Sequence, residues 1–447
     1  MLATVEEGGL TEEELRFLAL HDTARAGIRV AALRLASAVV GFMASVFIAR
    51  ALGPAGRGLY AFPLAVVSIV LALSHMGLEH ANVYLAARRV DLRRLWANSS
   101  LVAVFAGGLA WATLASAYAV VGGGVLGGVP LSWMVLGLIQ MPLLLQALYW
   151  TNVLQLAERF LMAVRAALIG SILSAVVTAV LFLTHALTPF RALLLWLLAN
   201  VATWGLLLWL GLRAGLASVA PDWRALREGI VFGLKAYVGV TFFFLLLRID
   251  QILVRGYLGF GALGLYSLAV SLSESLWRLT DTFAASLLPH QVRAAPGDER
   301  RLGDATARMS LVVAVVLAVV AWLAAPYAIR IAYGAKFDEM LWAFRWLLPG
   351  VVALSIQRPM GAVIVKEGRI WLVSYFGAAV LAVNVALNLA LLSRIGIVGA
   401  SIASSVTYVA LALLYVAATR QKGVAEWKDL RPRGTDVSRL WLGLTRR

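Results

Sequence analysis

R-I-D-Q-I-L-V-R-G-Y-L-G-F-G-A-L-G-L-Y, residues 248–266, is the stretch around which the rest of the chain can be arranged. Two cations and an acid follow a long apolar run, and a Leu-Gly pair precedes Gly-Leu-Tyr by four residues. The same signature occurs earlier as F-I-A-R-A-L-G-P-A-G-R-G-L-Y, residues 47–60, at an offset of 206 residues. Because this offset is close to half of the 447-residue chain, the repetition indicates an internal duplication. The sequence therefore predicts two similar halves.

The composition is that of an integral membrane protein. Hydrophobic residues make up 62% of the chain and charged residues 14%, and the mean hydropathy is +0.86, so there is too little polar surface for a water-soluble globule. The net charge of +16 comes from cations that stand singly or in short groups between apolar runs. That is the pattern of positively charged cytoplasmic loops, and we expect no nucleic-acid partner.

Motifs for cofactors are absent from the sequence. There is no cysteine, which excludes disulfides and thiolate metal sites. Phosphate-binding loops and His-Glu-x-x-His motifs are also missing. We therefore expect no metal, no cofactor and no use of ATP by this chain alone.

Twelve apolar runs are long enough to cross about 30 Å of hydrocarbon. They cover residues 27–50, 58–87, 98–121, 131–155, 162–184, 190–212, 229–256, 260–289, 308–333, 339–364, 371–392 and 396–419. Lys and Arg in alternate loops, counted from the N-terminus, total 26, against 7 in the opposite set. Both termini are therefore predicted to be cytoplasmic in a multi-pass protein of the cytoplasmic membrane.

The predicted fold is an all-α membrane protein with twelve transmembrane helices, arranged as two parallel-oriented six-helix repeats around a central cavity. Six crossings return the chain to the same side, so the repeats share one orientation. The predicted divisions are a cytoplasmic N-terminal segment at 1–26, an N-terminal bundle at 27–212 and a cytoplasmic linker at 213–228. A C-terminal bundle at 229–419 and a basic cytoplasmic tail at 420–447 follow. Thr11 and Glu14 form a capping box that predicts a short surface helix through Leu20.

Six cations fall inside the predicted spans: Arg34, Lys235, Arg248, Arg278, Arg345 and Arg358. A charge at the bilayer centre costs about 2.5–3.5 kcal/mol, so most of them must face a water-filled cavity or an acid. Arg345 is interpreted as reaching the membrane surface. The predicted substrate-binding residues are the other five, Arg34, Lys235, Arg248, Arg278 and Arg358. Lys235 and Arg248 lie about 220° apart on a straight helix and share a cavity only if that helix kinks.

The eighth predicted span carries one polar face. Its members recur at spacings of 4, 3, 4 and 3 residues, which places them on one side of a helix: Ser267, Ser271, Glu274, Arg278 and Asp281. Two interpretations remain open. The face is a self-neutralising ladder that holds helices together, or it handles substrate and protons. The predicted ion-coupling residues are Asp250, Glu274, Asp281 and Glu79, the last of which stands beside His80 near a span end, where an interfacial hydrogen bond is the alternative.

Several motifs in a fixed order resemble the polysaccharide-transport family of oligosaccharide flippases, part of the multidrug/oligosaccharidyl-lipid/polysaccharide exporter superfamily. They are the stretch at 47–60, R-I-D-Q-I-L-V-R-G-Y-L-G at 248–259, and N-V-A-L-N-L-A-L-L-S-R-I-G-I-V-G-A-S-I-A-S at 384–404. Asp250 matches the family's Arg-x-Asp. The resemblance implies a flippase, not an enzyme, that moves a lipid-linked (polyprenyl-pyrophosphate) oligosaccharide for cell-surface polysaccharide synthesis by alternating access. Membrane lipids and a glycan polymerase or ligase are the implied partners.

Two other functions compete with this one. A drug or metabolite exporter of the same superfamily would have the same fold, but an excess of cavity cations would repel cationic drugs. A membrane-embedded glycan ligase would need a long extracytoplasmic loop for its chemistry, and the longest such loop in the predicted topology is about ten residues.

Overall fold

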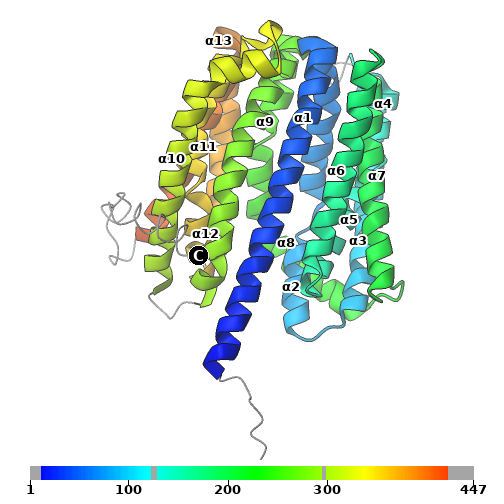
Figure 1. The fold of residues 1–447 in the computed structure, drawn as a ribbon, viewed down its shortest axis with the longest axis vertical. Helices are drawn as coiled ribbons and strands as arrows, with labels where there is room; N and C mark the ends of the chain where they lie inside the picture. The colour runs from blue at the N-terminus through cyan, green and yellow to red at the C-terminus, as the bar shows by residue number, and fades with distance from the viewer. Residues whose placement is uncertain (1–11, 122–127, 294–297, 421–447) are drawn as a thin grey trace, which may run out of the picture.

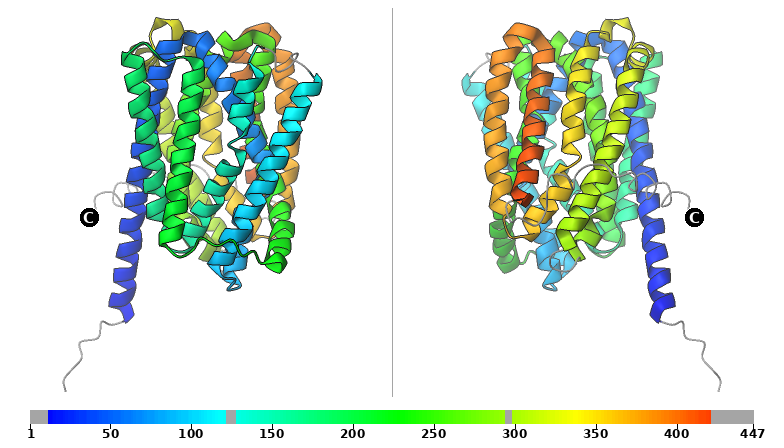
Figure 2. Two further views of the ribbon diagram at one scale, coloured as in Figure 1. Left: turned by 90° about the vertical axis from the view of Figure 1, so that its right-hand side faces the viewer. Right: turned by 90° about the vertical axis from the view of Figure 1, so that its left-hand side faces the viewer.

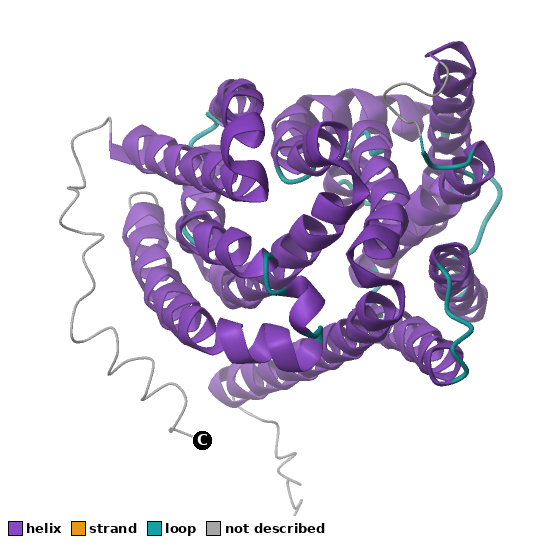
Figure 3. Cartoon of the chain, turned by 90° about the horizontal axis from the view of Figure 1, so that it is seen from above, coloured by secondary structure: helices purple, strands orange, loops and turns teal. Residues whose placement is uncertain are grey.

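The computed structural model describes residues 12–121, 128–293 and 298–420. Every regular element in these ranges is a helix, and none is a strand. Nine of the described helical stretches are long and apolar enough to cross a membrane. Seen from above in Figure 3, many helices are viewed nearly end-on, as expected of helices that cross a membrane side by side. The all-helical prediction is confirmed, and the protein is a multi-pass membrane protein.

The helices follow one another along the chain with short connections. Their bounds are α1 Glu12–Ser74, α2 Leu78–Ala87, α3 Leu92–Val121, α4 Leu131–Leu138, α5 Met141–Leu156, α6 Phe160–Leu183, α7 Pro189–Arg213, α8 Trp223–Leu246, α9 Ile249–Arg293, α10 Asp298–Ala332, the 3₁₀ helix η1 Ala335–Phe337, α11 Met340–Leu354, α12 Gln357–Lys366 and α13 Ile370–Arg420. In Figure 1, α1 to α7 lie on one side of the molecule and α10 to α13 on the other, with α9 beside α1.

Three of these helices contain a turn at a glycine. Gly53 in α1 has φ 65° and ψ −178°, Gly259 in α9 has φ 80° and ψ −173°, and Gly396 in α13 has φ 62°. Such backbone angles are available almost only to glycine, because a Cβ would clash. The two blue segments of α1 in Figure 1 lie side by side and join at the top. The Leu-Gly pair of the duplicated signature therefore turns the chain.

The two duplicated turns pack directly against each other. A Cβ added to Gly58 would stand 1.8 Å from the main-chain oxygen of Phe260, and one added to Gly264 would stand 1.9 Å from that of Pro54. Gly58 and Gly264 are offset by 206 residues, and so are Pro54 and Phe260. The contact is thus reciprocal, with each turn offering a glycine to the backbone of the other.

Three further pairs of described α-helices follow each other directly with only two residues between them: α4 and α5 at Ile139–Gln140, α8 and α9 at Leu247–Arg248, and α11 and α12 at Ser355–Ile356. The sequence predicted α4 with α5 as one span at 131–155, α11 with α12 as one span at 339–364, and α8 with only the start of α9 as one span at 229–256. Pro359 lies just inside α12, where its ring disfavours continuation of the helix from the N-terminal side, and the interruption lies there.

The N-terminal helix differs from its prediction. It was expected to end near Leu20 and to lie on the membrane surface, but α1 continues from Glu12 without a break to the turn at Gly53. No Gly or Pro stands between residues 12 and 26 to stop it. Figure 2 shows the start of α1 projecting beyond the bundle along its length. Thr11 and the basic tail at 421–447 lie outside the described residues.

Candidate functional site

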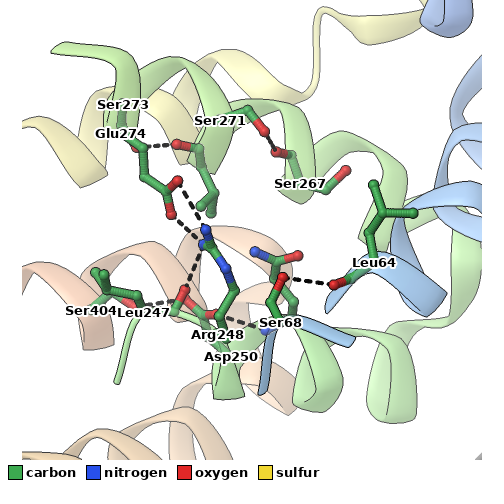
Figure 4. A network of polar contacts seen from close by, with 12 residues as sticks. Leu64, Ser68, Leu247, Arg248, Asp250, Ser267, Ser271, Ser273, Glu274 and Ser404 are labelled. Carbon is green, nitrogen blue, oxygen red and sulfur yellow. Dashed lines mark hydrogen bonds and ion pairs between the residues drawn. The ribbon is translucent and has the colours of Figure 1, made fainter. Parts of the chain in front are cut away.

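A buried carboxylate joins two arginines where α8 meets α9. Both Nη atoms of Arg248 donate to the Glu274 carboxylate, Nη2 at 3.1 Å, and Nη2 of Arg278 donates to it at 3.0 Å. Glu274 is 8% exposed. Figure 4 shows the Arg248 guanidinium extending from the helix junction toward Glu274 on α9. Fork-to-carboxylate pairing of this kind fixes geometry as well as charge.

The position of Arg248 follows from the interruption between α8 and α9. Residues 247 and 248 fall outside both helices, and Nη1 of Arg248 also donates to the main-chain oxygen of Leu247 at 3.1 Å. The side chain thus satisfies a carbonyl that the helix end leaves without a partner. At the start of α9, the Asp250 carboxylate accepts from the main-chain N–H of Gln251 at 2.7 Å, which suits an acid at a helix N-terminus.

Asp250 is also the centre of a buried hydrogen-bond cluster. It is 1% exposed, and its Oδ2 accepts from the hydroxyl of Tyr266 at 2.5 Å and from that of Ser404 at 3.0 Å. Tyr266 belongs to the duplicated signature, and Ser404 lies on α13, 154 residues from Asp250. This hydrogen-bond cluster therefore connects α9 to α13. Each carboxylate oxygen of Asp250 accepts a hydrogen bond, as a buried acid requires.

A second arginine–carboxylate pair lies farther along α9. Nε and Nη2 of Arg358 donate to the Asp281 carboxylate, Nη2 at 2.7 Å. Arg358 stands in the first turn of α12, just after the Ser355–Ile356 interruption. The side chains of Arg278 and Arg358 remain 63% and 43% exposed. Two guanidinium groups on the C-terminal side of the molecule are thus held by acids and still reachable by a ligand.

The family model described as "Polysaccharide biosynthesis protein" matches residues 47–342, well over half of the chain. The chain belongs to this family. The matched range contains both duplicated turns and the Arg248–Glu274–Arg278 network. A search of curated proteins finds no match. The fold of this polysaccharide biosynthesis protein is nonetheless shared with solved membrane transporters.

Three solved structures illustrate the likeness. A lipid II flippase MurJ in an inward closed conformation matches with TM-score 0.69 and 13% identity over 90% of this chain and 89% of that chain. An inward-facing MATE multidrug resistance transporter of the MOP superfamily matches with TM-score 0.68 and 14% identity over 86% and 94%. A MOP superfamily transporter from Pyrococcus furiosus matches with TM-score 0.58 and 13% identity over 89% and 94%. At these identities the likeness concerns the fold.

The structure brings some of the predicted site residues of this polysaccharide biosynthesis protein together and leaves others apart. Arg248, Glu274 and Arg278 form one network, and Asp250, Asp281 and Arg358 belong to the two groups beside it. Arg34 lies 5.3 Å from the ring centre of Phe160 on α6 instead. Lys235 lines a surface groove with Arg224 and Arg227. Thirteen residues of helix, about 20 Å, separate it from Arg248.

Glu79 occupies a separate group on α2. Its carboxylate pairs with Nδ1 of His75 at 3.0 Å and Nδ1 of His80 at 2.9 Å. The His75 ring stacks on Tyr237 of α8 at 4.5 Å and 9°. Sequence analysis singled out Glu79 with His80 and missed His75, which lies in the break between α1 and α2, where Met76 and Gly77 have positive φ, so helical spacing could not link it to Glu79.

The polar face of α9 forms ion pairs both within its own helix and with neighbouring segments, an arrangement compatible with both interpretations of the face. Glu274 holds Arg278 on its own helix but also Arg248 at the α8–α9 junction, and Asp281 holds Arg358 of α12. The face therefore joins the two helix interruptions of this region. Its remaining members are serines that bond their own helix, as Ser271 does to the Ser267 carbonyl at 2.7 Å.

Proposed function

We propose that this polysaccharide biosynthesis protein is a flippase that moves a polyprenyl-pyrophosphate-linked oligosaccharide across the cytoplasmic membrane by alternating access. The observation that carries the proposal is that Arg278 and Arg358 are each held by a carboxylate of α9 yet substantially exposed. Arg358 stands at one helix interruption, and Arg278 shares Glu274 with Arg248, which stands at the other. Interrupted helices with charged groups mark the substrate sites of many membrane transporters.

The chemistry of these arginines suits a pyrophosphate. A guanidinium presents parallel N–H donors that match two oxygens of a phosphate, as those of Arg358 now match the two oxygens of Asp281. Glu274 and Asp281 offset two of the three positive charges of Arg248, Arg278 and Arg358 while no substrate is bound, because an unpaired charge in the membrane is costly. The substrate phosphates would then replace a carboxylate as partner. Glu274 holds two arginines and is the acid through which we expect a proton to be coupled to transport.

The proposed transport cycle also needs a particular topology. We infer that α1 and α13 each cross twice, with reversals at Gly53 and Gly396, and that the candidate span Tyr237–Asp281, which begins in α8, also divides into two crossings at Gly259. Nine candidate spans then give twelve crossings. The halves 27–212 and 229–419 would then rock about a cavity, with the linker and both termini in the cytoplasm. The lipid tail would stay in the bilayer while the sugar and pyrophosphate pass between the halves.

The test is flipping of a fluorescent polyprenyl-pyrophosphate oligosaccharide by the full chain in proteoliposomes. Arg278→Gln and Arg358→Gln should each slow flipping by about tenfold or more, since each removes a charge-assisted phosphate contact worth roughly 1.5–3 kcal/mol. Arg345→Gln is the matched control, because Arg345 packs on Trp322 and Trp342 away from the two pairs. Normal flipping by both variants, or transport of a cationic dye in place of the lipid, would favour an exporter and overturn the proposal. Release of a chemically altered sugar would indicate an enzyme.

A further inference from the structure

A groove between α6 and α7 combines arginines with apolar side chains. It has a volume of about 400 Å³ and lies between the first turns of α6 and the last turns of α7. Its cations are Arg159, Arg165 and Arg213, and no acidic side chain is among the described residues that line it. The Arg213 guanidinium lies 4.5 Å from the ring centre of Trp209.

The apolar wall of this groove is open to its surroundings. Met162 is 42% exposed, Ile169 52% and Trp209 48%. Both helices are candidate membrane spans, and exposed apolar side chains on such a span are suited to contact with lipid tails. A tryptophan beside cations at the end of a span is the usual arrangement at the boundary between hydrocarbon and headgroups. The groove thus lies at the membrane surface with its cations toward water and its apolar part toward the lipid tails.

We propose that this groove binds an anionic phospholipid of the cytoplasmic leaflet. Its phosphate would lie among Arg159, Arg165 and Arg213, and its acyl chains would run along Met162 and Ile169. Charge complementarity decides the occupant, because three cations with no lining acid attract an anion and the apolar wall requires that this anion carry hydrocarbon. Basic pockets between helices on the cytoplasmic side have the composition that recognises such headgroups.

The site is separate from the proposed transport site. The groove belongs to α6 and α7, whereas Arg278 and Arg358 belong to α9 and α12, on the far side of α1 in Figure 1. A phospholipid in the groove would therefore be a bound component of the N-terminal helices and not the transported lipid. The inference is independent of the identity of the transported substrate.

The experiment uses Trp209 as a reporter in the full chain. Purified protein in mixed micelles receives brominated phosphatidylglycerol or brominated phosphatidylcholine with the same acyl chains, and quenching in the wild type is compared with quenching in Trp209→Phe. The difference isolates Trp209. Brominated phosphatidylglycerol should quench it at a lower concentration than phosphatidylcholine. The triple variant Arg159→Gln/Arg165→Gln/Arg213→Gln should weaken that binding roughly a hundredfold, from about a fivefold loss for each cation.

A matched control removes the same charge elsewhere at the same end of the molecule. Arg89→Gln/Arg224→Gln/Arg227→Gln alters three exposed cations outside the groove and should leave quenching of Trp209 nearly unchanged. Equal quenching by the two lipids, or an equal loss in the control, would overturn the proposal. So would displacement by millimolar inorganic phosphate, which would indicate a phosphate site, or a dimer in a native mass spectrum that shields Trp209, which would indicate a second copy in the groove.

Discussion

Gly58 faces the main-chain oxygen of Phe260 so closely that no Cβ fits between them, and Gly264 faces Pro54 in the same way. The two contacts are related by the 206-residue offset of the duplicated signature. They hold α1 and α9 together at the end of the molecule where both helices turn. The distance between the two turns is therefore set by backbone on both sides, and no side-chain rotation can relieve an added atom.

Gly58→Ala should destabilise the protein through this contact. The added Cβ would stand 1.8 Å from the Phe260 oxygen, so backbone must shift, and overpacking of this kind costs about 1–3 kcal/mol or more. The apparent unfolding temperature in detergent, followed by tryptophan fluorescence, should fall. Gly256→Ala is the control, because nothing lies within 4 Å of a Cβ at that position, and it should be neutral or slightly stabilising. Equal unfolding temperatures for the two variants would show that the turns are loosely packed.

Asp250→Ala should be strongly destabilising. The substitution leaves the hydroxyls of Tyr266 and Ser404 and an N–H of α9 without their acceptor. At about 1–3 kcal/mol for each buried group, the expected loss in the free energy of unfolding is about 3–5 kcal/mol. Asp338→Ala, which removes an exposed acid, should change it by less than about 0.5 kcal/mol. If Asp250→Ala unfolded at the same temperature as the wild type, the hydrogen-bond cluster around Asp250 would not stabilise the fold as described.

Glu274→Gln should impair transport far more than membrane insertion. The amide keeps the size of the side chain and one acceptor oxygen, but it lacks the negative charge that Arg248 and Arg278 share and it cannot release or take up a proton. Flipping in proteoliposomes should be lost, together with its response to an imposed pH gradient, while expression and elution volume remain normal. Retained gradient dependence in the variant would assign the α9 polar face to structure alone.

The topology can be checked with single cysteines, since the chain has none. Thr184→Cys lies in the turn between α6 and α7, and Val219→Cys lies in the linker, where Val219 is 98% exposed. A membrane-impermeant maleimide should label Thr184→Cys in intact cells and Val219→Cys only after permeabilisation. The reverse pattern would overturn the predicted orientation and, with it, the cytoplasmic placement of the lipid groove.

The linker should contribute a pH-dependent stabilisation. The hydrogen bond from the main-chain N–H of Ala225, followed by the contact with Arg94, lowers the pKa of Asp222 below its ordinary value of 3.8. A carboxyl with a lowered pKa in the folded state stabilises that state above the ordinary pKa, and the effect is lost as the pH falls through the lowered value. Asp222→Asn keeps a helix-capping side chain and removes the charge.

The unfolding temperatures of the wild type and Asp222→Asn should therefore differ by a constant amount from neutral pH to about pH 5 and converge below about pH 4. The difference should be small, because Asp222 is near the surface and its ion pair with Arg94, at 3.0 Å, is largely exposed. A difference that persists unchanged at low pH would assign the effect to shape and not to charge.

The sequence predicted the helical membrane class and the turn at each duplicated Leu-Gly, because apolar length and glycine spacing are local signals. It did not predict the interruption at Leu247–Arg248. The run F-F-F-L-L-L before Arg248 contains no Gly or Pro, so nothing local marks the break. Burial of Asp250 and pairing of Arg248 with Glu274 accompany it, and both depend on neighbouring helices.

The sequence also could not predict which residues far apart in the chain pair with each other. Helical spacing placed Glu274, Arg278 and Asp281 on one face but could not show that Asp281 meets Arg358, 77 residues away. Helical spacing also could not show how α1 is rotated about its axis relative to α6. Arg34 was therefore expected in the cavity, whereas the structure places it against Phe160. A face of a helix can be inferred from period alone, whereas the neighbour that covers it follows from packing.

The reciprocal contact of the two turns limits the substitutions that the sequence can accept during evolution. It is a contact of the kind that two identical molecules make about a twofold axis, each presenting the same surface to the other. Here both surfaces belong to one chain, so they are free to differ elsewhere. By the offset of 206 residues, Arg248, Glu274 and Arg278 correspond to Phe42, Ser68 and Ala72. The positions related by this offset thus differ in charge, while each turn still restricts the residues that the other can accept.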